Sequence, residues 1–147
     1  MKLFSALLCA AALAVRLSAA DLPPPPKEVL HLDHAKVDEA IAKGMSLAQN
    51  TSFKISTSRR TGPGIVEVHE HDTDIFYVLE GQATFVTGGQ VVEPKPSGPA
   101  EIRGKEITGG TPRNLVKGDI IVVPSGVAHW FKDVKGPFVY LVVKVTK

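Results

Sequence analysis

The sequence predicts an all-β fold, an antiparallel sandwich or barrel, preceded by one short helix. From residue 52 onward, short stretches alternate apolar and polar residues, as the strands of a half-buried sheet do. Turns rich in glycine or proline separate these stretches at short intervals, and only one earlier stretch has helical periodicity. Many short antiparallel strands favour a two-layer or closed β structure, because such structures leave few sheet edges unpaired.

The helix is predicted between Asp33 and Gly44. Asp33 is a suitable N-cap, because its carboxylate can accept from the free backbone N–H groups of the first turn. Val37, Ala40 and Ile41 share one helical face, and Gly44 can adopt the left-handed conformation that ends a helix. We therefore expect a short amphipathic helix ahead of the sheet.

Ten strands are expected in the rest of the chain. Between the third and fourth, Gly81-Gln82 is expected to form a hairpin turn. Residues 120–123 are apolar throughout, so this strand is expected to be buried on both faces. The expected strands cover residues 53–58, 65–71, 75–80, 83–87, 91–92, 101–102, 115–116, 120–123, 129–132 and 138–145.

The first twenty residues are expected to be a cleaved signal peptide. Lys2 provides a positive start, residues 3–15 form an apolar stretch too short to span a bilayer, and Ser18-Ala19-Ala20 resembles a cleavage site. The mature protein is then expected to be secreted or periplasmic. The only cysteine of the chain lies in the predicted leader, so no disulfide would stabilise the mature protein.

Removing the leader also changes the charge. The full chain has 17 Lys and Arg against 15 Asp and Glu; without Lys2 and Arg16 the count is 15 against 15. A mature net charge of zero, without clustered basic residues, argues against nucleic acid or anionic membrane partners.

Three histidines and a carboxylate suggest a metal site. His69 and His71 lie two residues apart in a predicted strand, so their side chains are expected to project from one face. Asp74 follows closely, and His129 is positioned to close the set from another strand. Such a ligand set suits one divalent transition metal, namely Fe, Mn, Ni, Cu or Zn.

Glu67 shares the face of His69 by the same two-residue period. It is the candidate catalytic residue, acting as an acid or base beside the metal. Two other roles remain open: it could orient a histidine by a hydrogen bond, or form a salt bridge with Arg59 or Arg60.

These residues resemble the two motifs of the cupin superfamily. The first motif is a glycine, five residues, His-x-His, three or four residues, Glu, six residues and Gly. Here His69-x-His71 matches, and Gly81 follows Asp74 after six residues, but only two residues separate His71 from Asp74 and only four precede His69 after Gly64. Asp also replaces the usual Glu.

The second motif is Gly, five residues, Pro-x-Gly, two residues, His, three residues and Asn. Its first four positions match at the family spacing, and Asp133 replaces the final Asn; the matching residues are Gly118, Pro124, Gly126 and His129.

The resemblance implies a double-stranded β-helix, or jelly-roll, cupin barrel. We therefore expect a signal peptide at 1–20, a Pro-rich spacer with the short helix at 21–50, and the barrel at 51–147. Because cupin barrels commonly pair through their N-terminal strands, it also implies a homodimer.

The resemblance also implies a function. We expect a metal-binding cupin enzyme, dioxygenase-like or isomerase- or lyase-like, that acts on a small oxygenated organic compound at a mononuclear His/carboxylate site. The alternative is a non-catalytic cupin that binds a small, sugar-like ligand or serves for storage. Fold and ligands alone do not select the reaction.

Overall fold

The computed structural model describes residues 21–147; the predicted signal peptide, residues 1–20, lies outside the described part. No helix in this described part is long and apolar enough to cross a bilayer. The elements in chain order are α1 (His34–Lys43), β1 (Ser46–Gln49), β2 (Phe53–Arg60), β3 (Val66–His69), β4 (Asp72–Thr87), β5 (Gln90–Val92), β6 (Lys95–Gly98), β7 (Glu101–Gly104), β8 (Glu106–Thr108), β9 (Thr111–Val116), β10 (Ile120–Val123) and β11 (His129–Thr146).

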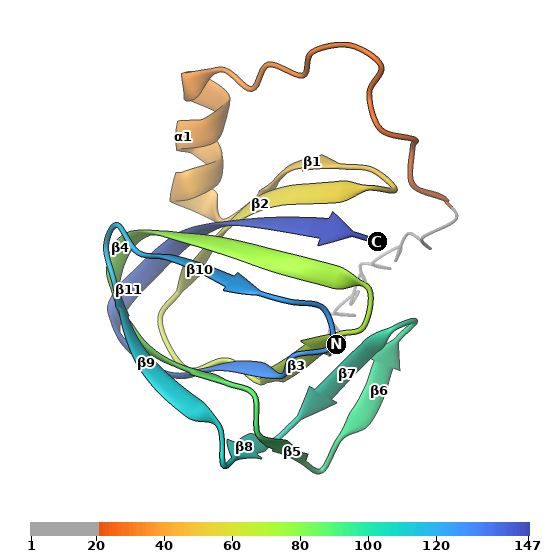
Figure 1. The fold of residues 1–147 in the computed structure, drawn as a ribbon. Helices are drawn as coiled ribbons and strands as arrows, with labels where there is room; N and C mark the ends of the chain where they lie inside the picture. Colours follow the sequence, from red (N-terminus) through yellow and green to blue (C-terminus); the bar gives the residue numbers. More distant parts are fainter. Residues whose placement is uncertain (1–20) are drawn as a thin grey trace, which may run out of the picture.

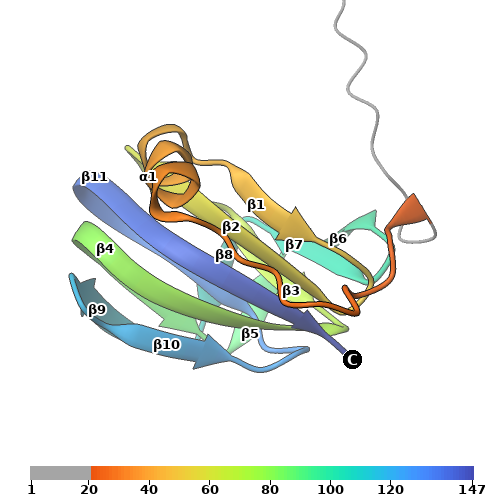
Figure 2. The same ribbon diagram turned by 90° about the horizontal axis from the view of Figure 1, so that it is seen from above.

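The strands form two facing layers with α1 outside one of them (Figures 1 and 2). Nine strands belong to one antiparallel sheet in the order β1-β2-β11-β3-β7-β6, with β4 joined to β11, β9 and β10, while β5 and β8 form a small second sheet. The long strands β4 and β11 run through both layers. This arrangement confirms the predicted jelly-roll with a short N-terminal helix.

The helix has the predicted caps. The Asp33 side chain accepts a hydrogen bond from the backbone N–H of Lys36 at 3.0 Å, and Gly44 has a φ of 68°. The helix packs on β2 through buried Ala40, whose carbonyl oxygen accepts a hydrogen bond from the Thr57 hydroxyl. Just beyond it, β1 pairs with β2, so the sheet includes a strand that begins before residue 51.

The hairpin expected at Gly81-Gln82 is wrong. Strand β4 continues through these residues and pairs with β11 on both sides of them. Gly81 has a φ of 83°, and its Cα faces the backbone of Pro137 at the point where the β4–β11 register shifts. A left-handed glycine therefore bends a continuous strand from one layer to the other. A glycine at such a bend gives the same sequence pattern as a glycine in a hairpin turn.

Substituting Gly81 by alanine is expected to lower the free energy of unfolding by about 2 kcal/mol or more, since the new Cβ would overlap the carbonyl oxygen of Pro137 in addition to straining φ. Gly136→Ala is the matched control: Gly136 has a φ of 67° but open space around its Cβ position, so only the conformational cost of about 1 kcal/mol applies. Urea unfolding of both variants measures the difference, and equal losses would contradict the close approach at Gly81.

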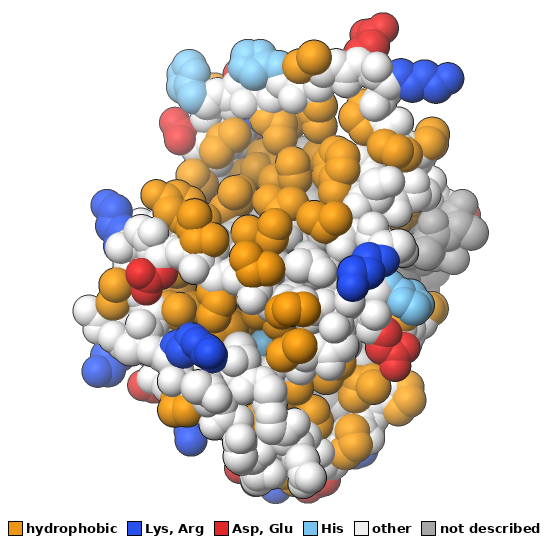
Figure 3. All heavy atoms as spheres, in the orientation of Figure 1, with side chains coloured by type: hydrophobic (Ala, Val, Ile, Leu, Met, Phe, Trp, Pro, Cys, Tyr) orange, Lys and Arg blue, Asp and Glu red, His pale blue; other side chains and the backbone are white. Residues whose placement is uncertain are grey.

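The prediction that residues 120–123 are buried on both faces is also wrong. Strand β10 pairs only with β4 among the described strands, and Ile120 and Val122 are 67% and 55% exposed. In register, Ile120 lies beside Tyr77, which is also exposed. These three side chains form what we call the outer apolar face, and Figure 3 shows hydrophobic side chains gathered over this side of the molecule, below the helix.

The space between the two layers holds an aromatic core. The rings of Phe76, Phe85, Phe131, Phe138 and Tyr140 all belong to one buried cluster. Phe85 and Phe131 lie with ring centroids 4.6 Å apart, and the ring of Phe85 also lies 5.9 Å from that of His129. The core therefore ends against an imidazole, and this contact fixes where the polar site begins.

Candidate metal centre

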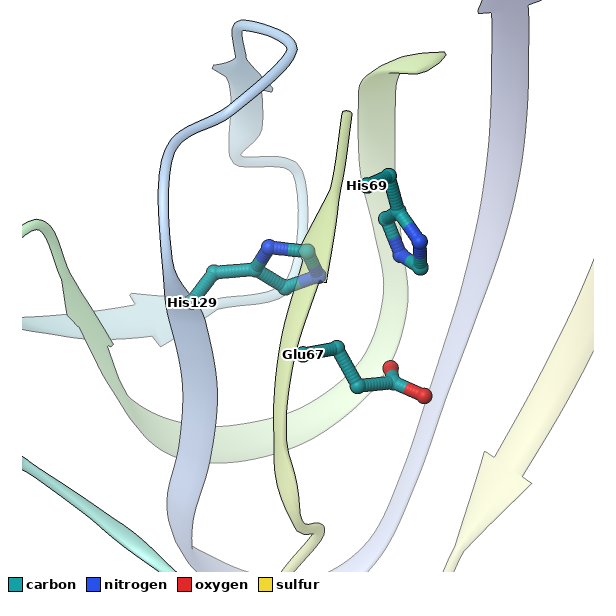
Figure 4. A group of neighbouring side chains, drawn as sticks. All are labelled: Glu67, His69 and His129. Atoms are coloured by element: carbon teal, nitrogen blue, oxygen red, sulfur yellow. The ribbon is translucent and has the colours of Figure 1, made fainter. Parts of the chain in front are cut away.

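Strand β3 provides two of the polar side chains. Its residues alternate faces, so Val66 and Val68 pack into a second apolar cluster while Glu67 and His69 face the interior between the layers. Figure 4 shows these two side chains and His129 gathered around one space. His69 is buried and Glu67 is partly buried.

His129 comes from the first residue of β11 and lies opposite Glu67 in the β11–β3 register. The turn before it is attached to β3, because the Gly126 N–H donates to the carbonyl oxygen of His69 at 2.8 Å. The turn formed by the Pro-x-Gly motif thus positions His129 beside His69. The centroids of the two rings lie 5.1 Å apart.

Asp74 completes the group from the start of β4. Its Oδ2 lies 3.4 Å from Nε2 of His69 and 3.7 Å from Nε2 of His129. One ligand atom from each of Glu67, His69 and His129 also lies within 4.8 Å of the others. The interior therefore collects two imidazoles and two carboxylates from three strands.

Hydrogen bonds set which nitrogen of each ring faces this group. Nδ1 of His69 lies 2.6 Å from Oε1 of Glu101, and Nδ1 of His129 lies 3.3 Å from the carbonyl oxygen of Val127. Because a carboxylate and a carbonyl oxygen accept, Nδ1 is the donor in both contacts. In its neutral form each ring then has the lone pair of Nε2 on the side of Asp74, where it could bind a metal.

Burial lowers the pKa of His129 below its usual 6.5, although the nearby Asp74 carboxylate opposes this effect. A lowered pKa keeps the imidazole neutral near pH 7, which is the form that binds metals.

This shift predicts a pH dependence of stability. As pH falls below about 6.5, the unfolded chain binds a proton that folded His129 resists, so the free energy of unfolding should fall, by at most about 1.4 kcal/mol per pH unit. Urea unfolding of chelator-treated wild type and His129→Gln measures it. The wild-type curve should lose more stability on acidification, and parallel curves would contradict the assignment.

A lysine holds Asp74 from the neighbouring strand. Lys144 of β11 lies directly opposite Asp74 of β4 in register, and its Nζ lies 2.8 Å from both carboxylate oxygens. The Asp74 side chain is only 3% exposed, so Lys144 provides the partner that a buried carboxylate needs. Because each carboxylate oxygen has two lone pairs, Oδ2 can still face the two imidazoles.

His71 lies outside this group. Strand β3 ends at His69, the chain turns, and His71 is exposed, so the shared strand face expected for the two histidines is wrong. The structure instead places Glu67-x-His69 inward. Counted from this pair, four residues precede Asp74, within the spacing of the cupin motif, which removes the short spacing found from His71.

Glu67 forms a salt bridge with an arginine other than the two considered from the sequence. Oε1 of Glu67 lies 3.7 Å from Nη2 of Arg103 on β7, while Arg59 pairs with Glu80 at the same distance. Arg60 instead donates to the Tyr140 hydroxyl at 3.0 Å and lies over the ring of Phe131. Neither of the two expected arginines therefore pairs with Glu67.

Sequence reasoning missed Glu101 and Lys144, which hold His69 and Asp74. Glu101 lies in a Pro- and Gly-rich stretch and reaches His69 only because β3 and β7 pair with His69 opposite Glu101. Lys144 lies in an apolar alternating strand, where a lone lysine usually faces solvent. Glu101 and Lys144 could be identified only from the register between paired strands, and the local sequence pattern does not specify that register.

Comparison with known proteins assigns the class. Residues 35–147 match the cupin family, so the chain belongs to the cupins. The search of curated proteins gave no match.

Solved structures support the fold. The chain is 16% identical to the cupin domain of Schizosaccharomyces pombe Cnp3, with a TM-score of 0.52, over 71% of this chain and 60% of that one, so it spans less than two thirds of that structure. It is 12% identical to a Bacillus halodurans protein, TM-score 0.57, over 86% of both chains. It is 18% identical to hydroquinone 1,2-dioxygenase from Sphingomonas sp. TTNP3 with 4-hydroxybenzoate bound, TM-score 0.53, over 86% of this chain and 85% of that one. At these identities the likeness concerns the fold alone.

Proposed function

We propose that this protein is a metal-dependent cupin enzyme that acts on a small oxygenated organic compound. His69, His129 and Asp74 would hold one divalent transition metal, and Glu67 would act as the acid or base. The observation that carries the proposal is the approach of one carboxylate oxygen to two imidazole nitrogens, at 3.4 and 3.7 Å.

The distances and the donor set fit a metal. Two neighbouring ligand atoms that each lie about 2.0–2.2 Å from one ion are about 2.8–3.1 Å apart in octahedral and about 3.3–3.6 Å apart in tetrahedral geometry, and the observed separations are close to the tetrahedral range. Each imidazole has its other nitrogen engaged by a second group, as metal-binding histidines usually do. Two histidines and a carboxylate leave coordination positions open and suit Fe, Mn, Ni, Cu or Zn.

When bound, such an ion would supply Lewis-acid or oxygen chemistry at the open positions. The surrounding residues have separate tasks. Glu101 orients His69, Lys144 holds Asp74 by an ion pair, and the Phe76 and Phe85 rings exclude water behind His129. Glu67 has 26% of its side chain exposed and is steadied by Arg103, so it lies where it can exchange a proton with a substrate.

Dioxygenase-like chemistry is the preferred reaction class. A site with two histidines and one carboxylate is typical of non-haem iron oxygenases, and a chain of the same fold is a hydroquinone dioxygenase. Isomerase- or lyase-like chemistry uses the same ligands and is distinguished by product analysis.

The test combines elemental analysis with turnover. Protein purified without chelator or histidine tag is expected to contain about one first-row metal per chain. Glu67→Gln is expected to keep this metal but to lose turnover by about a hundredfold or more, measured as oxygen uptake and product formation over phenols, keto acids and sugars. Loss of the metal in Glu67→Gln would make Glu67 a ligand. Bound metal and bound ligand without turnover of any class would favour the sugar-like binding or storage protein.

We also propose that the protein is a homodimer, with the contact on the outer apolar face rather than on the N-terminal strands that the family resemblance suggests. Tyr77, Ile120 and Val122 are exposed side by side, and an uncharged face of this kind can contact its own copy about a two-fold axis. Ile120→Lys is expected to shift the mass measured by light scattering from dimer to monomer. Val116→Lys, at an exposed apolar position on β9 outside this face, should leave the mass unchanged. A monomeric wild type would contradict the pairing.

Export is supported only by the leader pattern of residues 1–20. The intact mass of the protein recovered from the secreted or periplasmic fraction is expected to correspond to a chain that begins at Asp21, and recovery of the full-length chain in the cytoplasm would contradict this.

A further inference from the structure

We propose that the cavity beside the metal centre binds a small organic carboxylate, with Lys54 as the group that binds its negative charge. This inference rests on the proposed function only in taking the bound molecule as the substrate; the binding site itself stands on the cavity and its charges.

The cavity has a volume of about 450 Å³, within the range of sites for small molecules. It is lined by Glu101 and Lys144, the two residues that hold His69 and Asp74, and by His71. A molecule in this cavity therefore lies one side chain away from the metal centre. His71, which lies outside the metal centre, thus forms part of the cavity wall.

One cation in the cavity wall has no ion-pair partner among the described residues. Lys54 is half-buried and has no ion pair within residues 21–147, and it lies directly opposite Lys144 in the β2–β11 register. Two ammonium groups on the same face of neighbouring strands repel each other. Asp74 neutralises Lys144 but no carboxylate reaches Lys54 in this described part of the chain, so an anion is the missing partner.

The two acidic residues of the cavity wall each make a hydrogen bond to a group other than Lys54. Glu101 is 2.6 Å from Nδ1 of His69, and Asp72 accepts a hydrogen bond from the Thr146 hydroxyl at 2.7 Å. A divalent ion at the metal centre would add further positive charge on the far side of Glu101 and Lys144. Lys54 is therefore the cavity cation that an incoming carboxylate can pair with directly.

The rest of the cavity wall is suited to an apolar body. Leu22, Phe53, Pro99 and Ala100 line it, so the ligand that matches the whole cavity has an apolar part and one carboxylate. Leu22 is held there because the segment before α1 passes the turn between β1 and β2 (Figure 1), where the Thr51 N–H donates to the carbonyl oxygen of Pro23 at 3.0 Å.

Phenylacetate and the uncharged phenylacetamide are matched probes for this site. Titration of ¹⁵N-labelled, chelator-treated protein followed by amide chemical shifts reports both affinity and location, and the chelator prevents the carboxylate from binding a metal instead. Phenylacetate is expected to bind more tightly than phenylacetamide, with shifts at Leu22, Phe53 and Ala100. Added salt should weaken the binding of phenylacetate but not the binding of phenylacetamide.

Lys54→Gln is expected to weaken phenylacetate binding about tenfold, the effect of losing one charge-assisted hydrogen bond, and to leave phenylacetamide unchanged. Lys54→Arg should retain most of the affinity. Lys135→Gln, which changes an exposed lysine in the first half of β11, is the control and should bind as wild type does. Equal affinity for acid and amide, or no effect of Lys54→Gln, would overturn the proposal.

The same titration on the metal-loaded protein separates this inference from the proposed function. If phenylacetate binds at Lys54 but the protein takes up no metal, the carboxylate site stands and the proposal of a metal-dependent enzyme is rejected. If the protein takes up metal but phenylacetate does not bind at Lys54, the enzyme proposal stands and the carboxylate site is rejected.

Discussion

His69→Ala is expected to bind Co²⁺ or Zn²⁺ about a hundredfold or more weakly than the wild type, whereas His71→Ala is expected to stay within about threefold. The two histidines are only two residues apart, but His69 points at Asp74 from the end of β3 while His71 is exposed beyond it. Removing His69 takes away a buried nitrogen ligand, and removing His71 changes only the wall of the adjoining cavity.

Competition against a chromophoric chelator measures both affinities, and the visible bands of bound Co²⁺ report whether the coordination shell changes. His129→Ala should behave as His69→Ala does, because its Nε2 faces the same carboxylate oxygen. Equal losses in His69→Ala and His71→Ala would show that the chain closes around the metal with His71 inward, and the ligand set with Glu67 beside it would then be wrong.

Phe85→Ala is expected to lower the free energy of unfolding by about 3–5 kcal/mol. Phe85 is completely buried, and its ring contacts Phe76 and Phe131 as well as His129. Truncation would remove an aromatic side chain from the centre of the core and leave a cavity that these neighbouring rings cannot fill. Urea unfolding of the metal-free protein measures the loss.

Phe85→Leu is the matched control, expected to cost about 1–1.5 kcal/mol, because it keeps an apolar side chain in the same space. Metal affinity provides a second measurement. If the aromatic core positions His129, Phe85→Ala should weaken metal binding more than Phe85→Leu does. An alanine variant with wild-type stability would contradict the placement of Phe85 at the centre of the core.

The local pattern of the sequence was sufficient where neighbouring residues decide the structure. The helix begins at its Asp33 cap and ends at Gly44 as expected. The Pro124–Gly126 turn is followed by a buried His129 at the start of a strand, because that motif needs only a left-handed glycine and the residues next to it. His69 and Asp74 were likewise identified as inward-facing candidates from strand periodicity and spacing.

The errors have a common physical origin. Alternation says which residues share a face while a strand lasts, but it does not say that β3 ends at His69 and leaves His71 outside. An apolar run does not reveal that Ile120 and Val122 of β10 are exposed in the described part of the chain, and a glycine that bends β4 has the same sequence pattern as a hairpin turn. Each of these depends on strands that are distant in the chain.

The sequence by itself therefore determined the β architecture with its single helix, and three of the side chains that meet at the candidate metal centre, because periodicity, caps and turn residues act over a few neighbours. Only the tertiary structure decided that His71 lies outside them while Glu67 lies beside them, that Glu101 and Lys144 support them, and that Lys54, which has no ion pair within residues 21–147, faces the cavity alongside. Those choices depend on the register between β2, β3, β7 and β11, which is set by packing across the whole sheet.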